Sequence, residues 1–303
     1  MARRTLIEVA AAAALAACTA AGGSGGARPQ AAAPKAAGPG MNRCYNHDPY
    51  PSTYRPYPGV PTLIVNATIL DGEGGRINNG QILFREGHIV AVGQTVDRPE
   101  GVTVIDAAGR YVTPGIIDVH SHLGDYPSPG VPAHSDGNEA TAPVTAEVWA
   151  EHSVWPQDPG FARALTNGGV TTLQILPGSA NLFGGRSVVL KNVYARTVQG
   201  MKFPGAPYGL KMACGENPKR VYGQRQRMPS TRMGNIAVDR ATWARALEYK
   251  RRWDRYETQG GEMPTRDIQM DTLRGVLAGE ILVQNHCYRA DEMAIVMDMA
   301  REF

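Results

Sequence analysis

The chain has 303 residues, which is long enough for a small domain followed by most of a large one. Hydrophobic residues make up 43% and charged residues 19%, as is ordinary for a globular protein. The formal net charge of +3 is too small to indicate a nucleic-acid partner, so we expect none.

Residues 1–18 have the pattern of a secretory signal peptide. Arg3 and Arg4 precede an Ala-rich apolar stretch that is too short to span a bilayer. Leu15-Ala16-Ala17-Cys18 resembles the bacterial lipobox, whose cysteine becomes the acylated first residue of the mature protein. We therefore expect a lipoprotein of the bacterial cell envelope that faces the periplasm and meets the membrane through its N-terminal lipid only. The alternative is a plain signal peptide, with Cys18 incidental and the protein secreted to the periplasm.

Residues 19–59 are predicted to be an Ala/Gly/Pro-rich tether, because this segment lacks the clustered apolar residues that build a core. Residues 60–112 contain short β-favouring runs separated by turn residues, which predicts a small β-sandwich domain. The runs cover 63–65, 81–84, 89–92, 102–106 and 111–112.

Residues 113–303 alternate apolar strands with helical patterns, which is typical of parallel βα units in an α/β fold. Candidate strands are 116–120, 170–176, 187–193, 210–214 and 281–286; candidate helices are 161–167, 240–258 and 290–301, and 217–234 is expected to be a loop. These are the first five or so units of a (β/α)8 TIM-type barrel, which needs eight strands and about 250 residues. We expect the missing strands beyond Phe303, although a naturally smaller α/β fold is the alternative. The 303-residue chain alone should then be inactive and poorly soluble, because its sheet edges and apolar helix faces are uncovered.

The strongest functional signal is a His-x-His pair at the end of the first strand of this region. His120 and His122 are two residues apart, so a strand places both on the same face. The carboxyl ends of the strands form the mouth of a parallel barrel, where such folds place their chemistry. Two neutral imidazoles at this spacing can bind one divalent cation, and Asp118 on the same face could orient one of them.

Together with the preceding Pro114-Gly115-Ile116-Ile117-Asp118-Val119, the pair resembles the first-strand motif of the amidohydrolase superfamily, and more closely that of imidazolonepropionase-like envelope amidohydrolases. The resemblance covers residues 62–303. Its other motifs include Gly168-Gly169-Val170-Thr171-Thr172, Lys211-Met212-Ala213-Cys214-Gly215-Glu216-Asn217-Pro218 and Asn285-His286-Cys287. It implies a small β-sandwich beside a (β/α)8 barrel, with one or two divalent metals, commonly zinc, at the barrel mouth.

The resemblance also implies the metal ligands. His120 and His122 match the first-strand ligands, and His286 matches the fifth-strand histidine. Lys211 matches the fourth-strand lysine that is carboxylated and bridges the metals in binuclear members; Glu216 is the rival, because related enzymes place a glutamate on that strand. The sixth-strand histidine and the eighth-strand aspartate that serves as general base would lie beyond Phe303, so no catalytic residue is assigned within the chain.

The implied function is metal-dependent hydrolysis of a carbon–nitrogen bond by metal-activated water. Amide, cyclic amide and peptide-like bonds all remain open, so the expected partner is a small-molecule or peptide-like substrate. The alternative from another functional class is a non-catalytic envelope lipoprotein that uses the barrel as a binding scaffold.

The cysteines give a weaker indication. If Cys18 carries lipid, then Cys44, Cys214 and Cys287 remain, and their spacing is not that of a metal site. One disulfide could form among them. Cys214 and Cys287 lie in apolar runs, however, so we expect them to be buried thiols.

Overall fold

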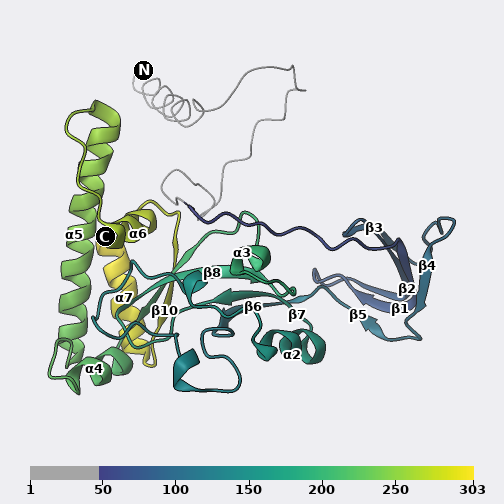
Figure 1. The fold of residues 1–303 in the computed structure, drawn as a ribbon, viewed down its shortest axis with the longest axis horizontal. Helices are drawn as coiled ribbons and strands as arrows, with labels where there is room; N and C mark the ends of the chain where they lie inside the picture. Colours follow the sequence, from purple (N-terminus) through teal and green to yellow (C-terminus); the bar gives the residue numbers. More distant parts are fainter. Residues whose placement is uncertain (1–47) are drawn as a thin grey trace, which may run out of the picture.

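The structure is a computed structural model, and it describes residues 48–303. The predicted signal peptide with Cys18, most of the predicted tether and Cys44 lie outside the described residues. Two five-stranded sheets organise the described chain, one at the end that carries β1–β5 and one between that end and the helices α4–α7 (Figure 1). Within residues 48–303, every helix is too short or too polar to cross a bilayer.

The first sheet contains the strands predicted for residues 60–112. They are β1 (Thr62–Leu70), β2 (Arg76–Arg85), β3 (His88–Gly93), β4 (Thr103–Asp106) and β5 (Tyr111–Val112). The order is β3-β2-β1-β4, and β5 follows β4 along the same edge of β1. The strands thus form one sheet where a two-sheet sandwich was expected. Each face carries its own apolar cluster, one around Ile69 and Ile82 and one around Leu63 and Leu83.

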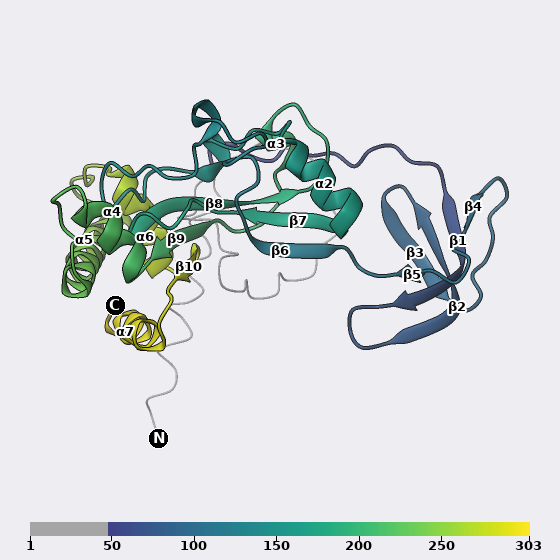
Figure 2. The same ribbon diagram turned by 90° about the horizontal axis from the view of Figure 1, so that it is seen from below.

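The second sheet curls like part of a barrel wall, with the order β10-β9-β8-β7-β6 (Figure 2). Its strands are β6 (Ile116–Ser121), β7 (Val170–Ile175), β8 (Phe183–Lys191), β9 (Gly209–Ala213) and β10 (Leu282–His286). This curled sheet is an incomplete TIM-like barrel and confirms the predicted fold class. Within the described chain β6 is an edge strand, and Ile117 and Val119 on it are 65% and 67% exposed.

The direction of β8 differs from the prediction of parallel units. β8 pairs antiparallel with both β7 and β9, whereas the pairs β6–β7 and β9–β10 are parallel. Only residues 176–182 connect β7 to β8. That connection is too short for the crossover of about a dozen residues or more that a parallel pair requires, so the chain must reverse.

The helices agree with the prediction at α2 (Pro159–Gly168) and α7 (Ala290–Glu302) and differ between them. α5 (Arg232–Gln259) begins eight residues before the expected start, because the Thr231 side chain caps it by accepting from the Gly234 amide. α4 (Glu216–Gly223) occupies part of the expected loop. The remaining elements were not predicted: α3 (Val198–Met201), α6 (Ile268–Leu277), and the 3-10 turns η1 (Pro132–His134) and η2 (Ala150–His152).

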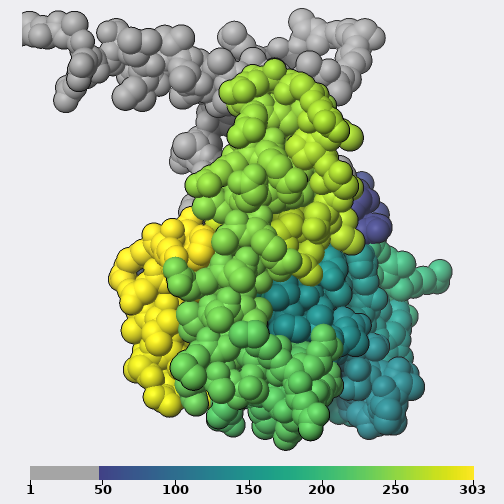
Figure 3. All heavy atoms as spheres, turned by 90° about the vertical axis from the view of Figure 1, so that its left-hand side faces the viewer, coloured from purple at the N-terminus to yellow at the C-terminus, as the bar shows by residue number. Residues whose placement is uncertain are grey.

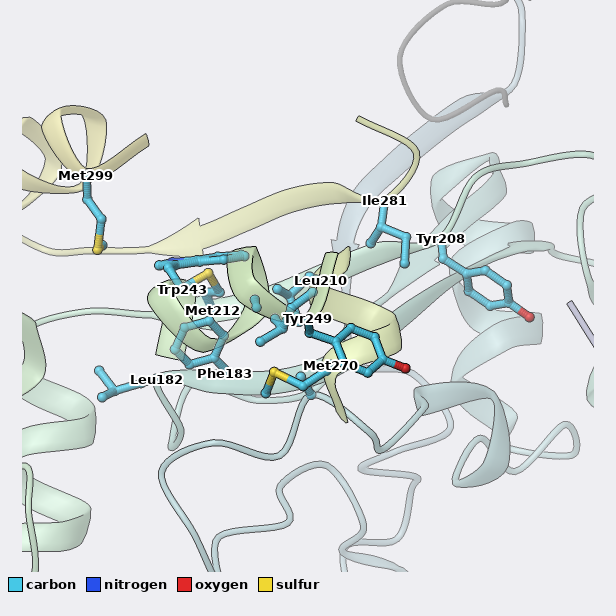
Figure 4. Close-up of a cluster of buried hydrophobic side chains, with 13 residues drawn as sticks. Leu182, Phe183, Tyr208, Leu210, Met212, Trp243, Tyr249, Met270, Ile281 and Met299 are labelled. Atoms are coloured by element: carbon cyan, nitrogen blue, oxygen red, sulfur yellow. The ribbon is translucent and has the colours of Figure 1, made fainter. Parts of the chain in front are cut away.

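The largest hydrophobic core lies between the second sheet and the helices α5 and α6. Trp243 and Tyr249 of α5 are buried there with Phe183, Leu210 and Met212 of β8 and β9 (Figure 4). The rings of Phe183 and Trp243 are 5.3 Å apart in an edge-to-face arrangement, which favours aromatic pairs. α5 runs along this side of the molecule with α7 beside it (Figure 3). The core therefore anchors β9, the strand that carries the predicted ligand Lys211.

A buried ion-pair network fastens the segment that follows residue 47 to the second sheet. The Nζ atom of Lys202 lies 2.9 Å from Oδ1 of Asp48 and 2.7 Å from Oε2 of Glu151. It also donates to the carbonyl oxygen of Tyr50 at 2.8 Å. Lys202 and Glu151 are both buried. Residues 48–50, which were assigned to the tether, are thus packed against the domain.

Replacing Lys202 with methionine should lower the free energy of unfolding by about 3–5 kcal/mol, because Glu151 would keep a buried charge without its partner. The matched control is Arg301→Met, which removes an exposed i,i+3 pair with Asp298 and should cost less than about 1 kcal/mol. Urea denaturation of the two variants measures the difference. Equal small losses would mean that the buried network contributes little.

Candidate metal centre

The second sheet places each predicted ligand at or near a strand end. His120 lies near the carboxyl end of β6 with His122 just beyond it, and His286 is the last residue of β10. β9 and β10 pair in parallel, with Lys211 opposite Gln284. Since strand residues alternate between faces, His286, two residues after Gln284, faces the same side of the sheet as Lys211.

Lys211 reaches across the curl of the sheet to His120. Its Nζ atom lies 3.2 Å from Nε2 of His120, although two strands separate β9 from β6. The rings of His120 and His122 are 5.2 Å apart. His286 is close enough for its charge to lower the pKa of His120. The Asp118 side chain accepts a hydrogen bond from the His120 amide at 3.1 Å and so fixes the main chain there. The structure therefore brings the four candidate ligands into one region.

Two of the histidines present ring nitrogens that are suited to a cation. Nδ1 of His122 lies 2.7 Å from the carbonyl oxygen of Leu176. A carbonyl only accepts, so Nδ1 carries the hydrogen, and Nε2 is left with its lone pair. Nε2 of His286 is buried and has no hydrogen-bond partner among the described residues. A buried nitrogen without a partner is costly, and a bound metal would satisfy it.

Burial favours the neutral, metal-binding form of these groups. Desolvation lowers the pKa of His120, His122 and His286, and the positive charge of Lys211 lowers each of them further. Lys211 is 1% exposed, and desolvation lowers the pKa of its amine to about 8. Metal ligands bind in their deprotonated forms, so the chemistry of this donor set fits a divalent cation.

The two candidates for the fourth-strand ligand, Lys211 and Glu216, lie in different surroundings. Within residues 48–303, no three His, Cys, Asp or Glu side chains converge closely enough to hold a metal by themselves. Glu216, the rival to Lys211, is exposed at the first position of α4, whereas Lys211 is buried on β9 beside His120. The structure therefore places Lys211, and not Glu216, beside the candidate ligand His120.

A disulfide joins Cys214 and Cys287, so the prediction of buried thiols was wrong. Ala213 and His286 are register partners at the ends of β9 and β10, and a cysteine directly follows each of them, with the two Cα atoms 5.1 Å apart. The cysteines are 73 residues apart in the chain, so their proximity depends on a strand register that the sequence does not display. The bridge ties together the strands that carry Lys211 and His286.

Sequence reasoning missed an acid-lined cleft of about 630 Å³ beside the centre. Its acidic residues are Asp125, Asp136, Glu139 and Glu147. Burial raises the pKa of Asp125 to about 7, and the charge of Asp136 adds to the rise although Ser153 opposes it with a hydrogen bond. The one available signal was the density of acidic residues in the segment between β6 and α2.

Comparisons with known proteins extend these observations. No family model matches the chain. The chain is 33% identical over 279 residues to a protein named amidohydrolase tasK from Hapsidospora irregularis, covering 81% of this chain and 28% of that protein. It is 46% identical over 52 residues to an imidazolonepropionase of Bradyrhizobium diazoefficiens, covering 16% and 13% of the two chains.

A solved structure resembles most of the described fold. The crystal structure of an amidohydrolase from Thermotoga maritima superimposes with a TM-score of 0.74 at 37% sequence identity. The match covers 80% of this chain and 62% of the Thermotoga chain. The chain therefore spans less than two thirds of that protein and little more than a quarter of the Hapsidospora protein.

Proposed function

The chain belongs to the amidohydrolase superfamily, and from this we propose that the complete protein is a metal-dependent hydrolase of carbon–nitrogen bonds. The observation that carries the proposal is the contact of the buried Lys211 amine with His120, 3.2 Å away, in the region of the sheet that also holds His122 and His286. Their nitrogens favour the neutral form, and Nε2 of His286 has no partner within residues 48–303.

The residues of the chain would hold and orient the cation. When bound, a divalent metal, commonly zinc, would lower the pKa of a water molecule and polarise the carbonyl of the scissile bond. His122 is held in one tautomer by the Leu176 carbonyl, which leaves the lone pair of Nε2 available for a cation. The ring of His286 is positioned by strand β10 and by edge-on contact with Tyr288, 4.5 Å away between centroids.

Lys211 would contribute the negative charge that the histidines lack. A neutral amine can add to CO2, which forms an N–C bond and releases one proton, leaving a carbamate with two oxygens. The burial that lowers the pKa of Lys211 to about 8 raises the fraction of neutral amine available for this reaction. Lys211 would then offer carboxylate-type oxygens to a bound cation, whereas an ammonium would repel it.

We also propose a periplasmic, lipid-anchored location. The lipobox-like Leu15-Ala16-Ala17-Cys18 supports it. The Cys214–Cys287 disulfide supports an oxidising compartment independently, because disulfides persist in the periplasm and are rare in the reducing cytosol.

The test is hydrolysis of a panel of N-acyl amino acids, dipeptides and cyclic amides by the full-length protein, before and after metal removal with a chelator. We expect turnover of at least one class, its loss on chelation, and its return when zinc is added. A metal-loaded protein that binds but does not cleave any of them would support the binding scaffold instead.

A further inference from the structure

The acidic residues that line the cleft beside the candidate metal centre face no Lys or Arg within its lining. Asp125, Asp136, Glu139 and Glu147 line it, and no Lys or Arg is among its lining residues. None of the four carboxylates forms an ion pair with a Lys or Arg of residues 48–303. When the charged groups that line a cleft all have one sign, they focus the electrostatic field into the cleft and attract ligands of the opposite charge.

Asp125 is a buried carboxylate with an unused oxygen in this wall. It is 0% exposed, and its Oδ1 accepts from Oγ of Ser153 at 2.9 Å. Its Oδ2 has no hydrogen-bond partner among the described residues. Asp136 is held next to it, because the Asp136 amide donates to the Asp125 carbonyl at 3.0 Å. Since an unpaired buried oxygen is costly, a donor that enters the cleft is favoured.

Glu147 provides a second, pre-positioned carboxylate. Its Oε2 accepts from Nε2 of Gln269 at 2.8 Å, so a neutral amide orients the carboxylate without cancelling its charge. Glu147 is half-buried and Asp136 is exposed. The cleft therefore offers acceptors at several depths along its wall.

The cleft opens next to the candidate ligands. It is lined by Pro177, which follows the residue whose carbonyl accepts from His122, and by Gly184 of β8. A Cβ atom at Gly184 would lie 3.4 Å from Cγ of Lys211. Gly184 thus adjoins both the candidate ligand Lys211 and the acidic cleft.

The arrangement fits an organic cation better than a metal ion. Direct metal coordination needs several oxygens at about 2.0–2.6 Å from one point. No three acidic, His or Cys side chains of the described residues converge in that way. A volume of about 630 Å³ instead suits part of an organic ligand.

We propose that this cleft binds a positively charged group of the substrate, so that the protein acts on carbon–nitrogen bonds in molecules that carry an ammonium or guanidinium group. The inference rests on the proposed hydrolase function for the position of the scissile bond. It adds the substrate class and assigns Asp125, Asp136 and Glu147 as specificity-determining residues.

The test compares two ligands by calorimetry on the full-length protein. Nα-acetyl-lysine amide carries the cation, and Nα-acetyl-norleucine amide has a similar shape without it. We expect the lysine compound to bind at least about tenfold more tightly, as charge-assisted hydrogen bonds allow. Asp136→Asn and Glu147→Gln should each reduce that preference severalfold, and the matched control Glu73→Gln, at an exposed turn of the first sheet, should keep it.

Equal affinity for the two ligands, or an undiminished preference in both variants, would overturn the inference. A divalent ion that binds wild type and is lost in Asp136→Asn would replace it with a metal site. The binding assay needs no turnover, so a cation preference without hydrolysis contradicts only the proposed function. Equal hydrolysis of charged and uncharged substrates contradicts only the cation cleft.

Discussion

Full-length protein carrying His120→Ala should lose most of at least one bound divalent metal. Few groups in the region can serve as ligands, and removing one leaves the cation under-coordinated in a site built around it. Nε2 of His120 also lies 3.2 Å from the Lys211 amine, so the substitution removes the contact between the candidate ligands on β6 and β9. We expect activity to fall by more than about 100-fold, since even residues that only support metal ligands are worth 10–100-fold.

Metal content per chain, measured by inductively coupled plasma mass spectrometry, checks this expectation. The matched control is His88→Ala, because His88 is exposed at the start of β3 in the first sheet. Wild type and the control should contain about two metals per chain if the site is binuclear. Equal metal content in all three proteins would rule out the His-x-His pair as ligands.

Lys211→Ala should abolish activity and regain part of it when formate or acetate is added. The buried amine is proposed to carry CO2, and a small carboxylate can occupy the space left by the shortened side chain and replace the two carbamate oxygens. We expect a loss of more than about 100-fold and rescue that saturates with carboxylate concentration. Initial rates with and without the added acid measure both.

Glu216→Gln is the matched comparison for Lys211→Ala. Glu216 is exposed at the start of α4, so its neutralisation should leave both metal content and rate close to wild type. Full activity in Lys211→Ala together with loss in Glu216→Gln would transfer the ligand role to Glu216. Loss in Lys211→Ala without any rescue, at unchanged metal content, would contradict the carbamate.

Local pattern was sufficient to locate most of the strands. β6, β7, β9 and β10 are apolar runs bounded by turn residues, and each was predicted within about two residues of its observed ends. The orientation of β8 was not predicted, because this strand was expected at 187–193 and the structure starts it at Phe183. The earlier start leaves only residues 176–182 to connect it to β7, which is too short for a parallel crossover. The early start of α5 was missed because its first two turns lack a clear apolar stripe.

The candidate site was only partly readable from sequence. The spacing of His120 and His122 predicts a shared face, whereas Lys211 and His286 were identified through the family resemblance. Contact between Lys211 and His120 depends on the curl of the sheet, because β6 and β9 would be about 14 Å apart across flat strands at the usual spacing. The buried Asp125 and the Cys214–Cys287 pair depend in the same way on long-range packing.

The central claim is that His120, His122, Lys211 and His286 hold a divalent metal, and anomalous X-ray diffraction at the zinc absorption edge tests it most directly. Crystals of the zinc-loaded full-length protein should show an anomalous peak about 2.0–2.1 Å from imidazole nitrogens of His120 and His122. His286 and the modified Lys211 should lie at the same peak or at a second one beside it. Zinc-loaded crystals with no peak among these four side chains, and with Lys211 still in contact with His120, would contradict the account.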